Sequence, residues 1–165
     1  MSLPKPAGGA GRGARQPAVA ATWLLDANSL IALGWPAHEH HERMRGWFGS
    51  HAGEGWATTA FTQAAFVRIV SQPAFSGHVI AIAQVAELLL RNTAHPLHRL
   101  LPMDFGFEQV LGCCSGRLFG HRQITDAYLL ATAARHGARL VTFDSGIRQL
   151  LATDLERERL LSVLN

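Results

Sequence analysis

Cysteine is scarce in this chain of 165 residues: there are two, Cys113 and Cys114, and they are neighbours. Adjacent cysteines do not have the spacing of zinc ligands, and they do not close an ordinary disulfide with each other. The pair therefore argues against a disulfide framework and against a cysteine-bound metal. We interpret both as small buried apolar residues of a protein in a reducing cytoplasm.

Long hydrophobic runs are also missing, although 48% of the residues are hydrophobic. The stretch VIAIAQVAELLL is interrupted by Gln84 and Glu87 and is too short to cross a bilayer. The stretch WLLDANSLIAL contains Asp26, whereas a secretory signal requires an uninterrupted apolar segment. We expect neither a membrane-spanning helix nor a signal peptide, but one globular domain with an ordinary core.

A basic surface is not indicated either, because the excess of positive charge lies near the start of the chain. The net charge of +3 comes from 15 Lys and Arg against 12 Asp and Glu. Lys5, Arg12 and Arg15 account for this excess, so the rest is formally neutral and gives no sign of a nucleic-acid-binding face. Residues 1–20 are rich in Gly, Pro and Ala and have no apolar period. We expect them to form a disordered extension before a single domain over 21–165.

The rest of the sequence alternates between two patterns. Short apolar runs typical of buried parallel strands occur at 21–26, 55–60, 98–103, 139–144 and 160–164. Helical patterns lie between them, over 27–48 with a break at Pro36, 61–72 ending before Pro73, 77–92, 104–120 and from 126 onward. This alternation predicts a three-layer α/β/α domain around a central, mainly parallel sheet.

Two of these helical segments have a clear apolar face. The face of the segment 77–92, which we expect to be amphipathic, consists of Val79, Ile82, Ala83, Ala86 and Leu90. The face of the helix that begins at Asp126 is narrow and small, and consists of Ala127, Leu130, Ala131 and Ala134. We expect the second face to pack on the core and Gly137 to end that helix.

Three aspartates stand where strands end or a helix begins. Asp26 and Asp144 follow two predicted strands, and Asp126 opens the helix that leads into the second of them. Each has an ordinary explanation, as a helix cap for Asp26 and Asp126 and as part of a turn for Asp144. Ligands of parallel α/β sheets bind at the carboxyl ends of the strands, however, and the crossover brings all three acids to that edge.

Carboxylates gathered at one place repel one another. Two unit charges 4 Å apart cost about 4 kcal/mol at an effective dielectric constant of 20, so such a cluster must bind a cation or change its pKa values. Oxygen ligands without a paired His or Cys favour Mg²⁺ or Mn²⁺ over zinc, and these ions hydrolyse phosphodiesters through activated water. The three aspartates are therefore candidate metal ligands and catalytic residues.

Three segments resemble the PIN domain family, namely WLLDANSLIAL, TTAFTQAAFVRIVSQP and RQITDAYLLATAARHGARLVTFDSGI. The similarity spans about residues 22–164 and is closest to the VapC ribonuclease toxins of VapBC-type toxin–antitoxin pairs. It implies a cytoplasmic endoribonuclease that uses Mg²⁺ or Mn²⁺, forms a homodimer and is silenced by a cognate antitoxin. Asp26, Asp126 and Asp144 match three of the family's four acidic positions. We expect the first two to contact the metal directly and Asp144 to act through a bound water.

Gln63 occupies the family's remaining acidic position. Its amide oxygen can ligate a metal or a bound water but carries no charge. The resemblance therefore leaves a second function open, that of a module which binds RNA or a protein without cutting it. Glu54 and Asp104 are acids that can substitute for the missing one, although neither stands in the family motif. Asn28 and Arg68 are accessory candidates, Arg68 for a phosphate contact or an ion pair.

Other classes of α/β protein fit less well. A haloacid-dehalogenase-like phosphatase needs a second aspartate where Asn28 stands, and a dinucleotide-binding domain needs G-x-G-x-x-G after the first strand. The histidines of HEHHERM (His38, His40 and His41) have no second ligand group downstream, so we interpret them as the polar start of a helix.

Overall fold

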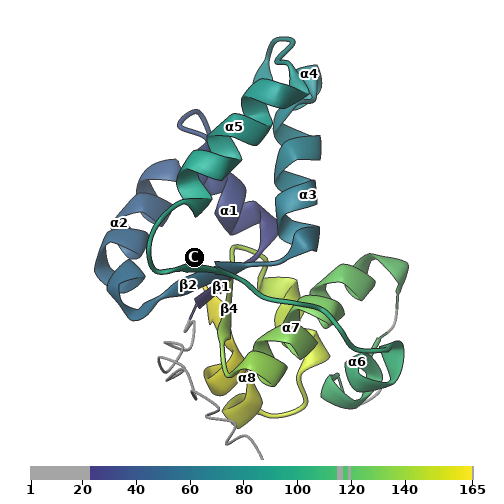
Figure 1. The fold of residues 1–165 in the computed structure, drawn as a ribbon. Coiled ribbons are helices and arrows are strands. Elements are labelled where there is room, and N and C mark those ends of the chain that lie inside the picture. Colours follow the sequence, from purple (N-terminus) through teal and green to yellow (C-terminus); the bar gives the residue numbers. More distant parts are fainter. Residues whose placement is uncertain (1–22, 115–116, 119, 165) are drawn as a thin grey trace, which may run out of the picture.

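The computed structural model describes residues 23–114, 117, 118 and 120–164. A five-stranded sheet lies at its centre, with all neighbouring strands parallel and in the order β3-β2-β1-β4-β5 (Figure 1). The strands are Trp23–Leu25 (β1), Trp56–Thr58 (β2), His98–Leu100 (β3), Arg139–Thr142 (β4) and Leu161–Val163 (β5). The predicted parallel sheet is confirmed. The extension expected over 1–20 lies outside the described residues.

Helices cover both faces of the sheet, which confirms the three layers. The upper layer in Figure 1 contains α1 (Ala27–Gly34), α2 (His41–His51), α3 (Ala60–Val70), α4 (Pro73–Ser76) and α5 (Ile82–Thr93). The lower layer contains α6 (Phe107–Cys113), α7 (Ile124–His136) and α8 (Asp154–Leu160). The short 3₁₀ helices are η1 (Ala52–Glu54) before β2, η2 (His121–Gln123) before α7 and η3 (Ser145–Leu150) after β4.

The core consists of two hydrophobic clusters, one on each side of the sheet. Successive residues of a strand point to opposite faces, so neighbours in β1 and β4 enter different clusters. Leu24 and Leu140 pack with residues of α7 and α8, whereas Leu25 and Val141 pack with residues of α1, α3 and α5. Strands buried on both faces are apolar throughout, and this is why their sequence shows short unbroken apolar runs.

The prediction of which residues of 77–92 face the core is wrong. Helix α5 begins only at Ile82, and it buries Val85 and Leu89 in the cluster shared with α1 and α3. Val79, Ile82 and Leu90 are 83%, 66% and 67% exposed. This segment has apolar residues on more than one face, and its periodicity alone does not show which face the rest of the chain covers.

Helix α7 begins at Ile124, two residues before Asp126, and is buried on more than its predicted narrow face. Ala134, expected in the core, is exposed, whereas Leu129 on another side is fully buried. The reason is that α7 contacts α6, α8 and β4 at once. Gly137 ends the helix in the left-handed region with φ of 63°, as predicted. The remaining predicted core positions, Ala127, Leu130 and Ala131, are buried.

Smaller differences concern helix boundaries. The helix expected over 104–120 is shorter, since α6 begins after Gly106 and ends at Cys113. Pro73 does end α3, but it also begins α4 at a position where its missing N–H costs nothing. Cys114 is buried and Cys113 half-buried, and both are free thiols. Within the described ranges, no helix is long and apolar enough to cross a membrane.

Gly34 at the end of α1 is a point of close packing between helices, and we predict that Gly34→Ala is destabilising. An added Cβ would lie 2.8 Å from Cε2 of Phe66 and 2.9 Å from Nδ2 of Asn92. We expect the free energy of unfolding to fall by about 1–3 kcal/mol in urea denaturation. The control is Gly46→Ala in α2, where an added Cβ meets nothing within 4 Å. That change should raise stability by up to about 1 kcal/mol. Equal gains for both variants would contradict the packing argument.

Candidate active site

The pairing of β1 with β4 brings the first and last aspartates to one edge of the sheet. Leu25 pairs with Val141, and the backbone N–H of Asp26 donates to the Val141 carbonyl at 3.0 Å. Asp26 is therefore the first residue beyond β1, and Asp144 lies two residues beyond the end of β4. Asp126 reaches the same region from the first turn of α7.

Asp26 is the most buried of the three acids, at 8% exposure. Its carboxylate accepts a hydrogen bond from the Thr142 hydroxyl at 2.7 Å and one from the backbone N–H of Ala27 at 2.6 Å. Burial raises the pKa of Asp26, and the nearby charge of Asp144 raises it further, although the two hydrogen bonds act in the opposite direction. The cap expected at the start of α1 is present, but it does not offset the cost of burying the charge.

Asp126 does not cap a helix, although its place in the first turn of α7 is one that the helix dipole favours for an acid. Gln123 is the N-cap of α7, and the Asp126 carboxylate accepts no hydrogen bond from any described residue. Burial, followed by the charges of Asp26 and then Asp144, raises the pKa of Asp126 to about 6. The helix-cap explanation is therefore wrong for Asp126, and its pKa is raised first by burial and then by the charges of the other two acids.

Asp144 does have the expected turn role. Its Oδ1 accepts a hydrogen bond from the backbone N–H of Gly146 at 2.7 Å, and it forms the N-cap of η3. The side chain is nevertheless exposed. Asp144 and Asp126 line the same hollow of about 190 Å³, together with Arg122 and Gly146.

Thr142 and Asn28 fix the geometry of this edge. The Thr142 hydroxyl donates to Asp26 and accepts hydrogen bonds from the Asn28 side chain at 2.9 Å and from the backbone N–H of Asp144 at 3.0 Å. Asn28 in turn accepts from the backbone N–H of Phe143 at 3.1 Å. Both ends of the Asn28 amide are thus bonded to residues at the end of β4.

The sequence reasoning missed Thr142 as part of the site. A usable signal was present: Thr142 and Asp144 are two residues apart and lie on the same side of the chain if the strand pattern continues. The register that pairs Leu25 with Val141 then sets Thr142 beside Asp26. Without that register, nothing in the sequence links a threonine at 142 to an aspartate at 26.

Gln63 lies near the same edge but bonds to another strand. Its Nε2 donates to the Thr58 hydroxyl at 2.9 Å, and that hydroxyl also bonds to Nε2 of His98 at 2.8 Å. Thr58 ends β2, which is adjacent to β1 in the sheet. The Gln63 carbonyl oxygen has no partner among the described residues.

The other candidates lie apart from the aspartates. Glu54 belongs to η1, which precedes β2 and therefore lies at the opposite end of the strands. Asp104 pairs with Arg135 at 3.5 Å. Arg68 is exposed and lines a separate hollow of about 250 Å³. Phe61 and Thr125 also line this hollow, and Thr125 directly precedes Asp126 in the sequence. The predicted polar helix start is confirmed at His40 and His41, which precede and begin α2.

The three aspartates are electrostatically coupled but do not form a compact triad. Among the described residues, no group of three or more His, Cys, Asp or Glu side chains is arranged to hold a metal ion as it stands. Direct ligation by all three therefore requires side-chain rotation. Asp144 has room for it because it is exposed.

Because the pKa of Asp126 is raised, we expect the stability of the protein in metal-free buffer to depend on pH. A carboxyl whose pKa is about 6 when folded and 3.8 when unfolded contributes stability below pH 3.8 that is lost as the pH rises through 6. Because Asp126 is partly solvated, we expect a loss of about 1–2 kcal/mol. Asp126→Asn should remove this loss, so urea unfolding at pH 4 and pH 7.5 should show a smaller difference for the variant. Identical differences in both proteins would contradict the assignment.

Comparison with known proteins identifies the fold family. The PIN domain family matches residues 23–151. Three ribonucleases of Mycobacterium tuberculosis are similar over most of their length. Ribonuclease VapC38 is 43% identical over 75% of this chain and 86% of its own length. Ribonuclease VapC39 is 42% identical over 76% of this chain and 91% of its own length. Ribonuclease VapC44 is 40% identical over 75% of this chain and 87% of its own length.

The matched family is the one that the sequence motifs resemble, and its expected α/β/α architecture is the one observed. The matched region begins at β1 and ends just after η3, so it includes the three aspartates and the strand pairing that brings them to one edge. The chain therefore belongs to the PIN domain family, in the branch of the VapC ribonucleases.

Proposed function

We propose that this protein is a metal-dependent endoribonuclease that acts as the toxin of a toxin–antitoxin pair. The observation that carries the proposal is that Asp26, Asp126 and Asp144 lie at the carboxyl edge of the sheet, where burial and then their mutual charges raise the pKa of Asp26 and Asp126. The relatives named ribonuclease VapC supply the reaction class, hydrolysis of RNA phosphodiester bonds.

The three carboxylates suit a hard divalent cation, Mg²⁺ or Mn²⁺. They offer only oxygen atoms, and a cation would relieve the repulsion that raises the pKa of Asp126. Asp26 and Asp126 would contact it directly, and Asp144 through a water molecule. Bound there, the ion would lower the pKa of a water molecule and offset charge on the phosphate under attack.

The protein's own contribution is orientation. Thr142 holds one carboxylate oxygen of Asp26 and is itself held by Asn28 and the backbone of Asp144, so three elements of the edge are tied to one hydroxyl. Hydrogen-bonded partners behind the ligands commonly decide how tightly a metal site binds. The Asp126 carboxylate accepts no hydrogen bond from the residues that the structure describes, so it can turn toward a ligand.

Protein partners are supported by exposed apolar residues. Val79, Ile82 and Leu90 of the α5 region are exposed, and large exposed apolar patches mark interaction sites. Phe61 and Phe107, also exposed, gather around Tyr128 with ring centroids 5.7 and 5.9 Å from it. We propose that such surfaces serve a homodimer and a cognate antitoxin. An antitoxin arginine or lysine that reaches the three acids would compete with the metal.

Removing either of two aspartates tests the cleavage reaction. Asp26→Asn and Asp126→Asn should each abolish Mg²⁺- or Mn²⁺-dependent cleavage of RNA, because each removes a charge from the cation site without removing a core side chain. The control is Asp104→Asn, which breaks only an exposed pair with Arg135 and should leave cleavage intact. Full activity in either site variant, with circular dichroism like that of the wild type, would contradict the site assignment.

A specific observation favours the alternative of a non-cleaving binding module: the side chain at position 63 is an uncharged amide held by Thr58. A cleavage assay of the wild type with RNA and added metal separates the two functions. Metal-stimulated cleavage that Asp126→Asn abolishes supports the enzyme. RNA binding without cleavage at any metal concentration supports the binding module.

The variant Gln63→Glu tests whether position 63 belongs to the cation site. If this side chain faces the cation, the added charge should tighten Mg²⁺ binding by about 1–3 kcal/mol after partial screening, which corresponds to roughly 5- to 150-fold. Calorimetric titration of wild type and variant tests this. Gln72→Glu, at the N-cap of α4 beyond the far end of α3, is the matched control and should change nothing. Equal affinities for wild type and Gln63→Glu would show that position 63 is outside the site.

A further inference from the structure

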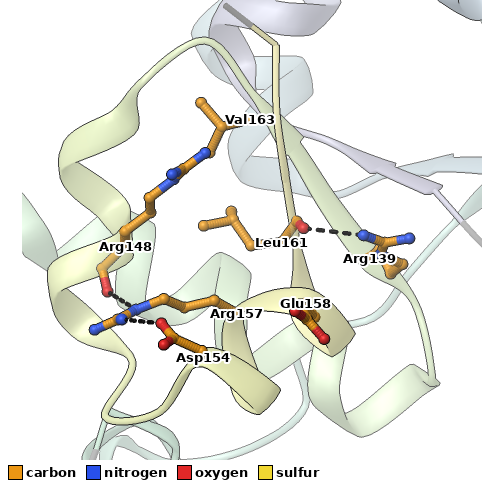
Figure 2. Close-up of a pocket in the computed structure, with 7 residues that line it drawn as sticks. All are labelled: Arg139, Arg148, Asp154, Arg157, Glu158, Leu161 and Val163. Carbon is orange, nitrogen blue, oxygen red and sulfur yellow. Dashed lines mark hydrogen bonds and ion pairs between the residues drawn. The ribbon is translucent and has the colours of Figure 1, made fainter.

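A second polar hollow lies on the flank of the sheet, and none of the three aspartates lines it. It has a volume of about 300 Å³ and is lined by Arg139 of β4, Arg148 of η3 and Arg157 of α8. Leu161 and Val163 of β5 form part of its wall, and Asp154 and Glu158 complete the lining. Figure 2 shows that the three arginines come from three different elements, with Arg157 turned toward Asp154 and with Arg148 and Arg139 on either side of Leu161. We refer to it as the arginine pocket.

Two of the three arginines of the pocket have no carboxylate partner among the described residues. Arg157 is the exception, because it donates to Asp154 at 2.6 Å and to the carbonyls of Arg148 and Leu151 at 3.1 and 2.9 Å. Neither Arg139 nor Arg148 pairs with a carboxylate in the described part of the chain. Three arginines and two acids line the arginine pocket, so it carries a net positive charge, and neither Arg139 nor Arg148 is paired with either acid.

Arg139 is held in place although it lacks an acidic partner. One of its terminal nitrogens donates to the Leu161 carbonyl at 3.2 Å, as Figure 2 shows, and its guanidinium lies 5.1 Å from the ring centre of Trp23. Its Nε is buried and has no hydrogen-bond partner among the described residues. A buried donor without an acceptor is unfavourable, so an anion near this nitrogen would stabilise the region. Arg148, by contrast, is exposed, and its side chain has no partner within the described part of the chain.

A single short helix separates the arginine pocket from the aspartates. Helix η3 has Asp144 as its N-cap, and its residues Gly146 and Ile147 line the hollow that contains Asp126 and Asp144. Arg148, the next residue, lines the arginine pocket. On the other wall, Val163 pairs with Thr142, the threonine that bonds to Asp26. The arginine pocket therefore lies next to the edge that carries the acids. Arg139, at the start of β4, is about 10 Å along the strand from Thr142 at its end.

We propose that the arginine pocket is a phosphodiester subsite for single-stranded RNA, and that Arg148 and Arg139 hold the backbone beside the bond to be cut. This inference rests on the proposed ribonuclease function. Three acids at the cleavage site repel a polyanion, so binding requires positive charge next to them. Arginine presents a rigid fork that matches phosphate oxygens, and grooves that bind single strands track the backbone with such residues. Both arginines act as positioning residues, since neither belongs to the catalytic edge.

The test is RNA binding by the full-length protein in EDTA, with fluorescently labelled single-stranded RNA titrated at several NaCl concentrations. For single strands, the slope of log K against log salt is about −0.7 for each phosphate that is neutralised. Arg148→Gln should therefore reduce the slope by about 0.7, and by a similar amount for RNAs of different sequence. Arg148→Lys, which keeps the charge, should retain the slope. The exposed position of Arg148 makes a folding defect in this variant unexpected.

Arg43→Gln is the matched control, because Arg43 is an exposed arginine on α2 in the other layer. Its slope should equal that of the wild type. Arg139→Gln should behave like Arg148→Gln, with an unfolding curve recorded alongside because Arg139 also contacts Trp23.

Each other outcome overturns the subsite. An unchanged slope for Arg148→Gln means that no phosphate is held there. Unchanged RNA binding with weaker binding of inorganic phosphate means that the pocket takes a free anion. Unchanged RNA binding with weaker antitoxin binding assigns the pocket to a protein. Cleavage assays on the same samples keep the two proposals apart. If RNA is cleaved but wild type and Arg148→Gln have the same salt slope, only the subsite proposal is wrong. If the slope depends on Arg148 but RNA is not cleaved, only the nuclease proposal is wrong.

Discussion

The parallel pairing of β1 with β4 is the constraint on which the site depends. It places Asp26 beside Thr142 and sets Asp144 just beyond the same edge, although more than a hundred residues separate Asp26 from both. The crossover through α7 then delivers Asp126 to that edge from below the sheet. A shift of this register by one residue would turn Thr142 away from Asp26 and separate the acids.

Charge is distributed in opposite senses on the two sides of η3. On one side, burial and mutual repulsion raise the pKa of Asp26 and Asp126, so the site is short of positive charge. On the other side, Arg139 and Arg148 lack a carboxylate partner within the described residues and the pocket is short of negative charge. A formally neutral domain thus carries two local imbalances that do not cancel, because they face different hollows. A cation on one side and a phosphodiester on the other would satisfy both.

The sequence predicts the layers and the strands well, because strands buried on both faces leave unbroken apolar runs whose spacing is visible without coordinates. It fails for α5, where the chain offers several apolar stripes and tertiary packing selects Val85 and Leu89. The candidate acids follow from their positions at element ends. Thr142 and the arginine pocket do not, since each depends on neighbours brought together by register and by the docking of α8.

The central claim is that the three aspartates form one cation site, and the most direct measurement is the titration of Asp126 by carboxyl ¹³C NMR with and without Mg²⁺. In EDTA, we expect a midpoint near pH 6, since burial and the charges of Asp26 and Asp144 raise this pKa. Saturating Mg²⁺ should lower the midpoint by at least one pH unit, because a bound cation favours the ionised form. A midpoint that is the same with and without Mg²⁺ would contradict the account.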